Sequence, residues 1–431
     1  MKQSLRNIFA YFLAALARGV LKKYKPTVVM VTGSVGKTST KDAIAAVLDS
    51  RFYMRASEKS YNSEFGVPLT ILGAKNPWAS PYAWVKVFGE ALALHLFPNH
   101  YPKILVLEVG ADRPGDLARI LRIATPNIVV VTQLPAVPVH VEAYATPAAV
   151  RDEEFAPAYA LSPDGCLVYS ADDDYVQALA KPLAVKVSSY GVDESADVKL
   201  SGAALYKEKG IPVGMESMVA AGGKEYVLRV KGALGRPQLL APAAAIAVAL
   251  ELGMTTKEAL KGLESYTPPA GRGRLIAGKN GATIIDDSYN ASPAAVEEGL
   301  ASLQIIASAQ PKTRRIAVLG DMLELGRYSA REHELIGISA QKLCDVLITV
   351  GTRSHATAEA AMTAGMKEEC IHQFDTARDA ADFLKDFIQK NDAILIKGSQ
   401  SVRMERVVEV ILANHEDRQY LVRQDAEWKR R

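Results

Sequence analysis

A glycine-rich segment near the start of the chain carries the residue types that bind phosphate groups. The segment VVMVTGSVGKTSTKDAI, from Val28 to Ile44, is typical of a β-strand, a loop and the start of a helix. The N–H groups of such a loop and the positive end of the helix dipole converge on an anion. The lysine that follows adds a point charge, and the next hydroxyls suit Mg²⁺. Only two residues separate the glycines, where the general P-loop has four. The candidate phosphate-binding residues are Gly33, Ser34, Val35, Gly36, Lys37, Thr38 and Ser39.

Two further side chains are candidates for the same site. Glu108 ends the apolar run ILVLE, and a carboxylate at the end of a strand beside a P-loop suits a Mg²⁺ ligand. His140 follows a third apolar run, in VTQLPAVPVHVEAY. A single loop histidine indicates little by itself, but beside the other two features it becomes a candidate metal or phosphate ligand.

The elements that must position these residues alternate along the chain. From Pro26 onward the apolar runs TVVMVTG, KILVLEVG and NIVVVTQL alternate with helical segments such as KTSTKDAIAAVLDS and PGDLARILRIA. This spacing predicts an α/β fold with a doubly wound, mostly parallel sheet. Ligands of such sheets bind at the carboxyl ends of the strands, where Gly33, Glu108 and Gln133 fall.

The remainder of the chain predicts a second α/β domain. The segment from Leu183 to Lys231 is β-rich, APAAAIAVALELGM is a helix, and ESYTPPAGRGRL is a linker rich in Pro and Gly. Beyond it ATIIDDSYN, RRIAVLGDM, DVLITVG and AILIKGS each run from an apolar strand into a polar loop. We therefore predict an amphipathic N-terminal helix (1–25), a central P-loop domain (26–270) and a C-terminal Rossmann-like α/β domain (271–431).

Composition limits the classes of function. The chain has 431 residues, of which 49% are apolar and 23% charged, with a net charge of +3, as in ordinary globular proteins. There is no long basic run or RNA-binding signature, so we expect no nucleic-acid partner. Cys166, Cys344 and Cys370 lack metal-ligand spacing and indicate reduced thiols of a cytoplasmic protein.

The N-terminal segment SLRNIFAYFLAALARGVLKKYK raises the question of a membrane. Its apolar run from Ile8 to Ala17 is too short to span a bilayer, and no small-residue cleavage site follows it. The segment predicts either a helix docked on the domain or an interfacial helix that makes peripheral membrane contact. A second aromatic-rich stretch, NPWASPYAWVKVFGEALALHLFPNHYPK, either shares that surface or packs on the core. The basic residues that would face anionic lipid are Arg18, Lys22, Lys23 and Lys25.

Taken together, the segments resemble the Mur ligases, a family of ATP-dependent enzymes that form amide bonds. The loop TGSVGKTST is similar to the short TGTNGKTT loop of the family, and further matching segments follow in order over most of the chain. The most specific are IDDSYNASP, LGDMLELG and KGS…ME. They are most similar to the branch that adds D-alanyl-D-alanine to a muramoyl-peptide in cell-wall synthesis. The resemblance implies that ATP phosphorylates a substrate carboxylate and that an amine then attacks the acyl phosphate.

The resemblance also implies roles for residues around the phosphates. Lys37 and the loop amides would hold the β- and γ-phosphates of ATP. Thr38 and Glu108 would bind one Mg²⁺ and His140 a second. Asn62, in SYNSEFG, matches an asparagine near the reacting phosphate.

Other roles implied by the resemblance fall in the linker and the C-terminal domain. Arg272 of the linker would reach the nucleotide. Adenine and ribose would be held by Asp286 or Asp287 with Tyr289 and Asn290. The small peptide that supplies the amine would lie against Asp321, Glu324, His333, Lys397, Ser399 and Arg403.

Two departures from the family pattern concern the acceptor and the second metal. Only about 25 residues precede the first central strand, so we expect no counterpart of the family's UDP-binding domain; the N-terminal helix and the Trp-containing stretch could hold a lipid-linked or otherwise altered acceptor. A family lysine, carbamylated to carry negative charge toward Mg²⁺, corresponds in position to Glu154. Glu154 would supply that charge directly. Asp152 is the neighbouring alternative, and a solvated RDEE helix face with a weakly held second metal is another.

Two more departures concern nucleotide and amine recognition. Where the family reads Gly-x-His-Asn-x-x-Asn, the chain has GRPQLLAP, with Pro237, Gln238 and Ala241 at the three positions, so an adenine contact is lost or moved. Gln400 replaces an arginine of the family's KGSR, which removes a bidentate carboxylate clamp that Arg403 could replace.

Three functions stay open at this point. The first is a ligase that adds D-alanyl-D-alanine to a muramoyl-peptide carboxylate with ATP and Mg²⁺. The second is a related ligase for another acceptor, such as a poly-amino-acid or a folate-type γ-carboxylate. The third is an inactive nucleotide-binding scaffold. The joint presence of Lys37, Asn62, Glu108, His140 and Arg272 favours an enzyme.

Overall fold

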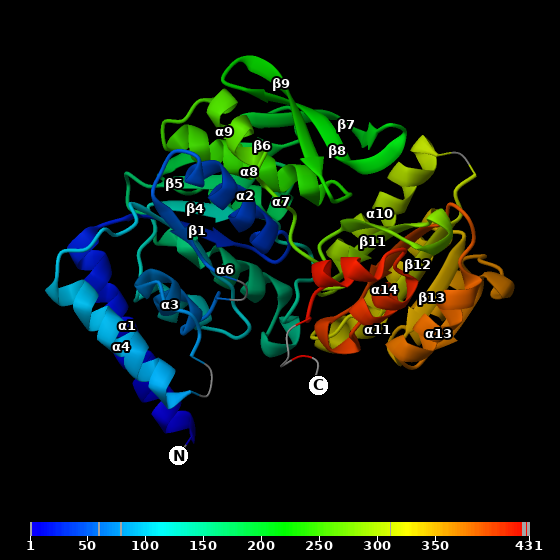
Figure 1. The fold of residues 1–431 in the computed structure, drawn as a ribbon, viewed down its shortest axis with the longest axis horizontal. Helices are drawn as coiled ribbons and strands as arrows, with labels where there is room; N and C mark the ends of the chain where they lie inside the picture. Colours follow the sequence, from blue (N-terminus) through cyan, green and yellow to red (C-terminus); the bar gives the residue numbers. More distant parts are fainter. Residues whose placement is uncertain (1, 59–60, 78–79, 311, 425–427, 429–431) are drawn as a thin grey trace.

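Two α/β units, each built on its own sheet, make up the molecule (Figure 1). The structure is a computed structural model that describes residues 2–58, 61–77, 80–310, 312–424 and 428. The two units are joined by residues 264–273, between helix α9 and strand β10, which contain the Pro- and Gly-rich linker. The phosphate-binding loop therefore lies in the first unit, and the DDSYN segment lies in the second.

The first unit contains a nine-stranded sheet in the order β2-β3-β1-β4-β5-β6-β7-β8-β9. Neighbouring strands pair in parallel from β2 to β7 in this order, and β8 pairs antiparallel with both β7 and β9. In chain order its elements are β1 (Thr27–Thr32), α2 (Lys37–Asp49), β2 (Met54–Ala56), α3 (Gly66–Leu72), α4 (Pro81–Leu96), β3 (Ile104–Glu108), α5 (Asp116–Leu121), β4 (Ile128–Val131), η1 (Val141–Ala143), α6 (Pro147–Tyr159), β5 (Cys166–Ser170), α7 (Asp174–Ala180), β6 (Lys186–Gly191), β7 (Val198–Glu208), β8 (Ile211–Ala221), β9 (Lys224–Lys231), α8 (Pro237–Glu251) and α9 (Thr256–Leu263).

Helices cover both faces of this sheet. On one face α8 lies against α2 and α9, and 11 of its 15 residues are buried because its many alanines allow close approach. On the other face α1, α3, α5 and α6 enclose a second apolar cluster. Strands β1, β3 and β4 are therefore buried on both sides, which explains their continuous Val, Ile and Leu runs. The predicted doubly wound, mostly parallel α/β sheet is confirmed.

The second unit has a six-stranded sheet in the order β10-β11-β15-β12-β13-β14, with only β10 antiparallel. Its elements are β10 (Arg274–Ala277), η2 (Lys279–Gly281), β11 (Thr283–Asp287), α10 (Pro293–Ala309), β12 (Arg315–Gly320), η3 (Gly326–Tyr328), α11 (Ser329–Leu343), β13 (Val346–Val350), α12 (His355–Thr363), η4 (Glu368–Cys370), β14 (Ile371–Phe374), α13 (Ala377–Phe387), β15 (Ala393–Lys397), η5 (Gln400–Val402), α14 (Glu405–Ile411) and η6 (His415–Tyr420). This parallel sheet with flanking helices confirms the predicted Rossmann-like second domain.

Helix α1 (Lys2–Tyr24) packs side by side with α4 at one end of the first unit (Figure 1). The two helices approach closely at Gly19, where a Cβ would lie 2.0 Å from the His95 ring. Lys23 closes the pair, because its Nζ donates to the carbonyl groups of Leu94, His95 and Phe97 at 2.8, 3.0 and 2.7 Å. Across the described ranges we find no helix with both the length and the hydropathy of a membrane span. The N-terminal helix is thus docked on the domain.

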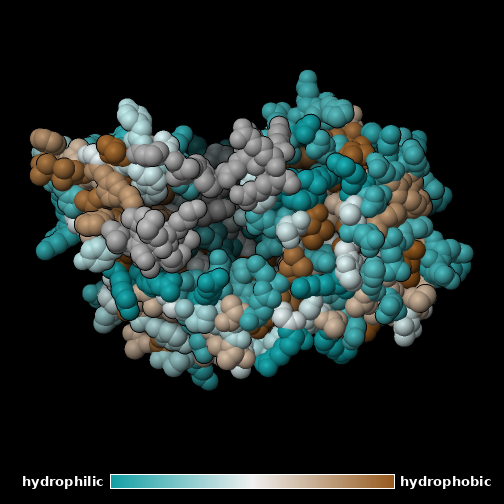
Figure 2. All heavy atoms as spheres, turned by 90° about the horizontal axis from the view of Figure 1, so that it is seen from below, coloured by the Kyte–Doolittle hydropathy of each residue, from teal (hydrophilic) through white to brown (hydrophobic). Residues whose placement is uncertain are grey.

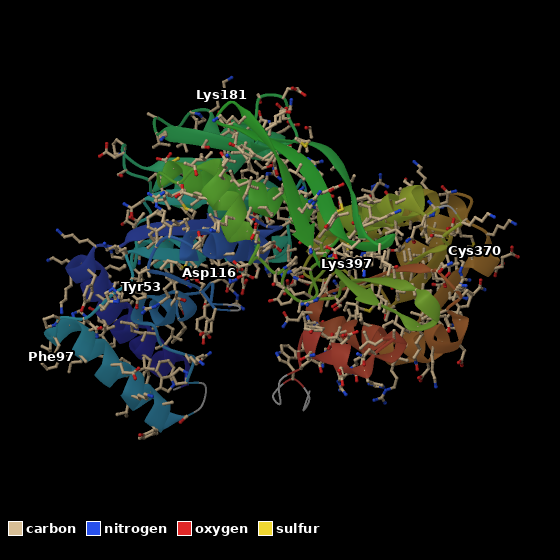
Figure 3. The ribbon with its side chains drawn as sticks, turned by 45° about the horizontal axis from the view of Figure 1, so that its top comes forward. Tyr53, Phe97, Asp116, Lys181, Cys370 and Lys397 are labelled. Atoms are coloured by element: carbon tan, nitrogen blue, oxygen red, sulfur yellow. The ribbon has the colours of Figure 1, made fainter. Side chains whose placement is uncertain are left out.

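An exposed apolar stripe runs along α4. Tyr82, Val85, Leu92 and Leu96 recur at intervals that place them on one face of the helix, and they are between 52% and 81% exposed. Figure 2 shows hydrophobic residues gathered at the end of the molecule formed by α1 and α4, at left. Phe97, which follows α4, is also exposed and lies at this outer end in Figure 3. The pair of helices therefore buries one side against the domain and leaves an apolar side in solvent.

Candidate active site

Residues 33–36 form a tight loop between β1 and α2. Gly33 has a φ of 119°, and a Cβ on it would lie 2.3 Å from the Thr132 hydroxyl, so the loop requires glycine there. Gly36, with a φ of 92°, precedes the first turn of α2. A hydrogen bond from Thr40 N–H to Gly36 C=O begins the helix, so the N–H groups before Thr40 point out of its end. The loop has the conformation of an anion site.

Lys37, the first residue of α2, is held by the loop and by a carboxylate from α6. Its Nζ donates to Gly33 C=O and lies 3.8 Å from Glu154 Oε1. Glu154 is buried, and its Oε2 accepts hydrogen bonds from the Thr32 hydroxyl at 2.9 Å and from Gly33 N–H at 3.2 Å. Asp152, the alternative from the sequence, is exposed on the same helix. Glu154 is therefore an acidic group beneath the phosphate-binding loop, not part of a solvated helix face.

Thr38 and Glu108 offer a position that suits Mg²⁺. Thr38 Oγ1 donates to Glu108 Oε1 at 3.1 Å. Glu108 Oε2 is buried and has no hydrogen-bond partner among the described residues, which is costly unless a cation binds there. The described ranges contain no group of three or more His, Cys, Asp or Glu side chains arranged to hold a metal. Proteins often hold Mg²⁺ by one or two carboxylates, while substrate phosphates and waters complete its shell.

His140 connects the two units. Its Nδ1 lies 2.8 Å from Glu324 Oε2 in the second unit, and its Nε2 lies 3.5 Å from Asp112 Oδ1. Burial disfavours the charged imidazolium, but the hydrogen bond with Glu324 and the two carboxylates outweigh burial and raise the pKa of His140 above its ordinary value. The same hydrogen bond lowers the pKa of Glu324. In this structure, His140 is thus engaged by carboxylates from both units.

A cavity of about 650 Å³ between the two units brings most of the predicted residues together. Asn62 lies on the wall of this cavity near Lys37. The Asn62 amide nitrogen and the Lys37 amine nitrogen are both within 4 Å of the position that a Cβ on Gly110 would take. From the first unit its lining includes Ser34, Gly36, Lys37, Thr38, Asn62, Glu108, His140 and Glu154. From the linker and the second unit it includes Arg272, Tyr289, Asn290, Glu324, Ser399 and Gln400. Residues that the sequence analysis assigned to nucleotide, metal and amine therefore face one space.

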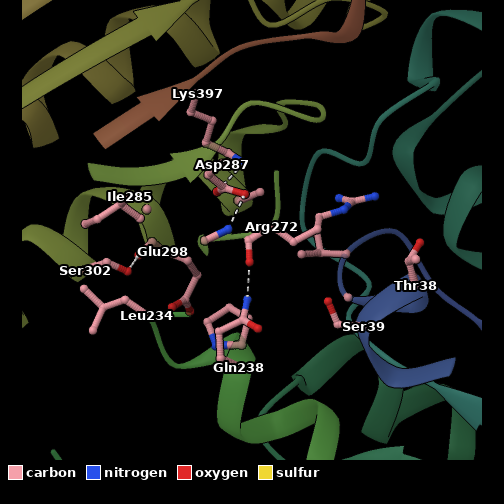
Figure 4. Close-up of a pocket in the computed structure, with 16 residues that line it drawn as sticks. Thr38, Ser39, Leu234, Gln238, Arg272, Ile285, Asp287, Glu298, Ser302 and Lys397 are labelled. Carbon is pink, nitrogen blue, oxygen red and sulfur yellow. Dashed lines mark hydrogen bonds and ion pairs between the residues drawn. The ribbon is translucent and has the colours of Figure 1, made fainter. Parts of the chain in front are cut away.

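A smaller pocket adjoins this cavity at the junction of the units (Figure 4). In it Lys397 Nζ donates to Asp287 Oδ2 at 2.6 Å and to Asn290 C=O at 3.0 Å. Burial lowers the pKa of Lys397, although the Asp287 carboxylate opposes this shift. Arg272 lies between this ion pair and the start of α2, and its guanidinium stacks 4.2 Å from the Tyr289 ring centre. Figure 3 shows Lys397 at the same junction.

The residues at the start of α8 that differ from the family motif also lie in this region. Gln238 Nε2 donates to Arg272 C=O at 2.8 Å, and its Oε1 is buried with no partner in the described part of the chain. Val35, Ser39 and Pro237 line the same pocket. Ala241 lines a neighbouring pocket of about 100 Å³ that also contains an ion pair between Arg236 and Asp172. Pro237, Gln238 and Ala241, which stand where the motif has His, Asn and Asn, thus line two pockets at the junction.

Two predicted residues of the second unit serve the fold of their own loops. Asp286 is fully buried, and its Oδ1 accepts hydrogen bonds from the hydroxyl and N–H of Ser288. Burial raises the pKa of Asp286 to about 6, although the hydrogen bonds from Ser288 oppose the rise. Asp321 Oδ1 accepts from Ser354 N–H at 2.8 Å, before α12. Of the two candidate aspartates for adenine and ribose, the structure brings Asp287 to the junction, not Asp286.

Two further predicted residues are engaged by side chains or backbone of their own domain. His333 is buried, with Nε2 accepting from Met322 N–H at 3.1 Å and Nδ1 lying 2.7 Å from Ser329 C=O. It braces the loop after β12 and has no ring nitrogen left for a substrate. Arg403 pairs with Glu405 and is not among the residues that line the cavity, but its guanidinium lies 5.5 Å from the ring centre of Trp428, which is.

Three residues at the site were not singled out from the sequence. Thr32 holds Glu154 through its hydroxyl, and Asp112 contacts His140. Trp428 lines the cavity from the C-terminal end of the chain. A signal was present for the first two, since each is a polar residue at or just beyond the end of a central strand. Nothing near Trp428 in the sequence connects it to the site.

Comparison with known proteins gives a consistent result. The model of the Mur ligase middle domain matches residues 31–249, and the model of the Mur ligase glutamate ligase domain matches residues 271–400. The UDP-N-acetylmuramoyl-tripeptide–D-alanyl-D-alanine ligase of Mycobacterium tuberculosis is 31% identical over 90% of this chain and 73% of its own length. The enzyme of the same name from Bacillus subtilis is 27% identical over 93% and 79%.

Solved structures agree with the sequence relatives. The crystal structure of MurF ligase from Thermotoga maritima in complex with ADP superposes with a TM-score of 0.76 at 26% identity, covering 95% of this chain and 84% of that chain. MurF from Acinetobacter baumannii, at 24% identity, shares the fold with the same TM-score over 93% of this chain and 79% of its own. With both family models matched over most of its length, and with the expected loop, carboxylate and linker arginine around one cavity, the chain belongs to the Mur ligase family.

Proposed function

We propose that the protein is an ATP-dependent, ADP-forming ligase that joins D-alanyl-D-alanine to the terminal carboxylate of a muramoyl-peptide in cell-wall synthesis. The observation that carries this proposal is the shared cavity, in which the phosphate-binding loop of one domain faces Glu324 and Ser399 of the other. The relatives of this name, at 27% and 31% identity, support the substrate pair. The division into a nucleotide-binding domain (26–270) and an amine-binding domain (271–431) is part of the proposal.

The residues of the loop would position ATP for attack by a carboxylate. Lys37 and the outward N–H groups of α2 neutralise the β- and γ-phosphates, and Asn62 lies beside Lys37 where the acceptor carboxylate would approach. A carboxylate oxygen attacks the γ-phosphorus, ADP leaves, and the amine of the dipeptide attacks the acyl carbon and releases phosphate. Such chemistry needs alignment and charge neutralisation more than a covalent nucleophile. The cavity between the domains also limits water around the reactive acyl phosphate.

The residues present fit Mg²⁺ as the accompanying ion. Glu108 and Thr38 would hold it, since the unpaired Glu108 oxygen is buried beside the Thr38 hydroxyl. When bound, Mg²⁺ supplies charge neutralisation at the phosphates. Glu154 and His140 are the candidates for a second ion. Both line the cavity, and His140 would have to exchange Glu324 or Asp112 for the metal.

A second candidate function is a ligase for another acceptor, which the altered side chains around Gln238 and Gln400 favour. ADP release should be measured with D-alanyl-D-alanine and a panel of acceptors that includes muramoyl-peptides, a folate-type γ-carboxylate and a poly-amino-acid. We expect release with a muramoyl-peptide, and its loss in Lys37→Ala. ADP release with another acceptor but not with a muramoyl-peptide would identify that acceptor as the substrate. No ADP release with any acceptor would support an inactive scaffold.

We also propose that the protein works in the cytoplasm, with the stripe on α4 in peripheral contact with the membrane. The stripe is apolar, and the exposed basic residues Arg18 and Lys22 of α1, with Lys25 directly after the helix, complement anionic lipid. Wild type should sediment with phosphatidylglycerol vesicles, and Leu92→Glu/Leu96→Glu should not. Leu335→Glu/Ile338→Glu, on the second domain, is the matched control. A dimer that the α4 variant dissociates, without vesicle binding, would assign the stripe to a second copy instead.

A further inference from the structure

A second groove, of about 850 Å³, lies beside the active-site cavity. Its walls come from α1, from the segment before α3, and from the segment between β3 and the end of α5. Asn62 and Asp112 line both spaces, so the groove opens onto the cavity at the residue that lies next to Lys37. Any molecule whose carboxylate reaches Lys37 from this side must pass along the groove.

The groove carries positive charge that the protein does not neutralise. Of its four arginines, Arg119 is paired with Asp116 at 2.8 Å and with Glu64 at 3.8 Å. The guanidinium groups of Arg18 and Arg113 have no ion pair or hydrogen bond with any described residue. The guanidinium group of Arg122 likewise has no partner within the described ranges.

The acidic residues of the groove are already engaged. Glu64 and Asp116 contact Arg119, and Asp116 also accepts from the N–H groups of Asp112 and Arg113 at 3.2 and 2.9 Å. Asp112 itself faces His140. Three guanidinium groups therefore remain for an anion. Their planar, multiple donors match phosphate oxygens better than a lysine would.

Helix α1 lies next to both the groove and α4. Arg18, Tyr11 and Ala14 face the groove, while Gly19 lies against α4 on another side of the same helix. The groove and α4 thus lie against different sides of α1. A lipid that enters the groove from a membrane in contact with α4 would pass along α1.

We propose that the groove binds the diphosphate of a lipid-linked acceptor, a muramoyl-peptide carried on a membrane-embedded polyprenyl diphosphate. Arg18, Arg113 and Arg122 bind the diphosphate, the lipid chain leaves past α1 into the bilayer that contacts α4, and the peptide carboxylate passes Asn62 to Lys37. This proposal names the acceptor of the proposed ligase and rests on that function for its catalytic part, but its binding part does not.

Binding is tested by sedimentation of the full chain with phosphatidylcholine vesicles, with and without a few per cent of a polyprenyl diphosphate. We expect the diphosphate to strengthen binding of wild type by roughly tenfold or more. Arg18→Ala/Arg113→Ala/Arg122→Ala should lose this gain. Arg378→Ala/Lys385→Ala/Lys390→Ala removes the same charge from the exposed side of the second domain and should keep it. Equal binding to both vesicles by wild type, or equal loss in both triple variants, would overturn the diphosphate site even if the ligase activity is real.

Steady-state kinetics distinguish a lipid-linked diphosphate from the diphosphate of a UDP-linked acceptor. With ATP and D-alanyl-D-alanine in excess, we compare a lipid-linked acceptor in vesicles, the same muramoyl-peptide linked to UDP, and the peptide without a diphosphate. The groove variant should raise KM for the lipid-linked acceptor and leave KM for the diphosphate-free peptide unchanged. A wild type that uses the UDP-linked acceptor as well as the lipid-linked one would contradict the lipid assignment. An equal rise in KM for the diphosphate-free peptide would contradict a diphosphate site.

Discussion

Replacing Glu154 by glutamine probes the carboxylate beneath the phosphate-binding loop. The variant keeps the size of the side chain, so the hydrogen bonds from Thr32 and Gly33 can persist while the negative charge is lost. In the structure that charge lies 3.8 Å from Lys37 Nζ. The attraction at this distance is about 1 kcal/mol with the dielectric constant of water and about 4 kcal/mol with an effective value of about 20. Nucleotide phosphates must compete with Glu154 for Lys37.

Two measurements should therefore move in opposite directions. Without Mg²⁺, Glu154→Gln should bind ADP roughly fivefold tighter or more, the factor that about 1 kcal/mol gives, because Lys37 is released to the phosphates. With Mg²⁺ and all substrates, kcat should fall roughly 10- to 100-fold, as is usual when a charge beside a catalytic metal is removed. Calorimetry gives the first value and a coupled assay of ADP release gives the second.

Asp152→Asn is the matched control, because it removes the same charge from the exposed side of α6. It should change neither value. An unchanged kcat in Glu154→Gln would refute a part for this carboxylate in phosphoryl transfer, and weaker ADP binding would refute its competition for Lys37. Wild-type activity should also be independent of added bicarbonate, since Glu154 needs no carbamylation. A clear stimulation would contradict the idea that it replaces a modified lysine.

Three further predictions concern the metal, the loop and the second domain. Glu108→Gln should raise the Mg²⁺ concentration for half-maximal ADP release by roughly tenfold or more, and an unchanged titration would exclude Glu108 as a ligand. Gly33→Ala should weaken ADP binding by at least roughly tenfold, because its Cβ would meet the Thr132 hydroxyl at 2.3 Å; calorimetry that finds normal affinity would count against the loop geometry. Asp286 has a folded-state pKa raised to about 6, so the stability that its protonated form contributes is present in acid and lost as pH rises through about 6. Asp286→Asn should remove this loss from urea unfolding of the protein, about 2 kcal/mol between pH 4 and pH 7. An identical pH dependence in both proteins would contradict it.

The sequence allowed the prediction of features that depend on neighbours along the chain. The loop around Gly33 and Gly36 and the end of β3 at Glu108 could be predicted because a strand, a turn and a helix follow one another within a few residues. The parallel sheet then places these ends at one edge. The same local pattern located the linker with Arg272.

Features that depend on docking between distant segments could not be predicted. His140 and Glu324 are 184 positions apart and meet only because the two domains close on each other. His333 has the residue type of a site residue, but its ring is buried and braces its own loop. The groove requires Arg18, Arg113 and Arg122 to come together from α1 and both sides of α5. No spacing in the sequence indicates these contacts.

The central claim, that the loop aims the γ-phosphate of ATP at a carboxylate, is tested most directly by oxygen transfer. A muramoyl-peptide acceptor labelled with ¹⁸O in its terminal carboxylate is turned over with ATP and D-alanyl-D-alanine, and the released phosphate is analysed by mass spectrometry. Attack by the carboxylate and departure of phosphate from the acyl carbon transfer one carboxylate oxygen to each phosphate. We predict ¹⁸O in the phosphate, in proportion to the amide formed and absent in Lys37→Ala. Unlabelled phosphate released by wild type during turnover would show that water attacks ATP, and would contradict the account.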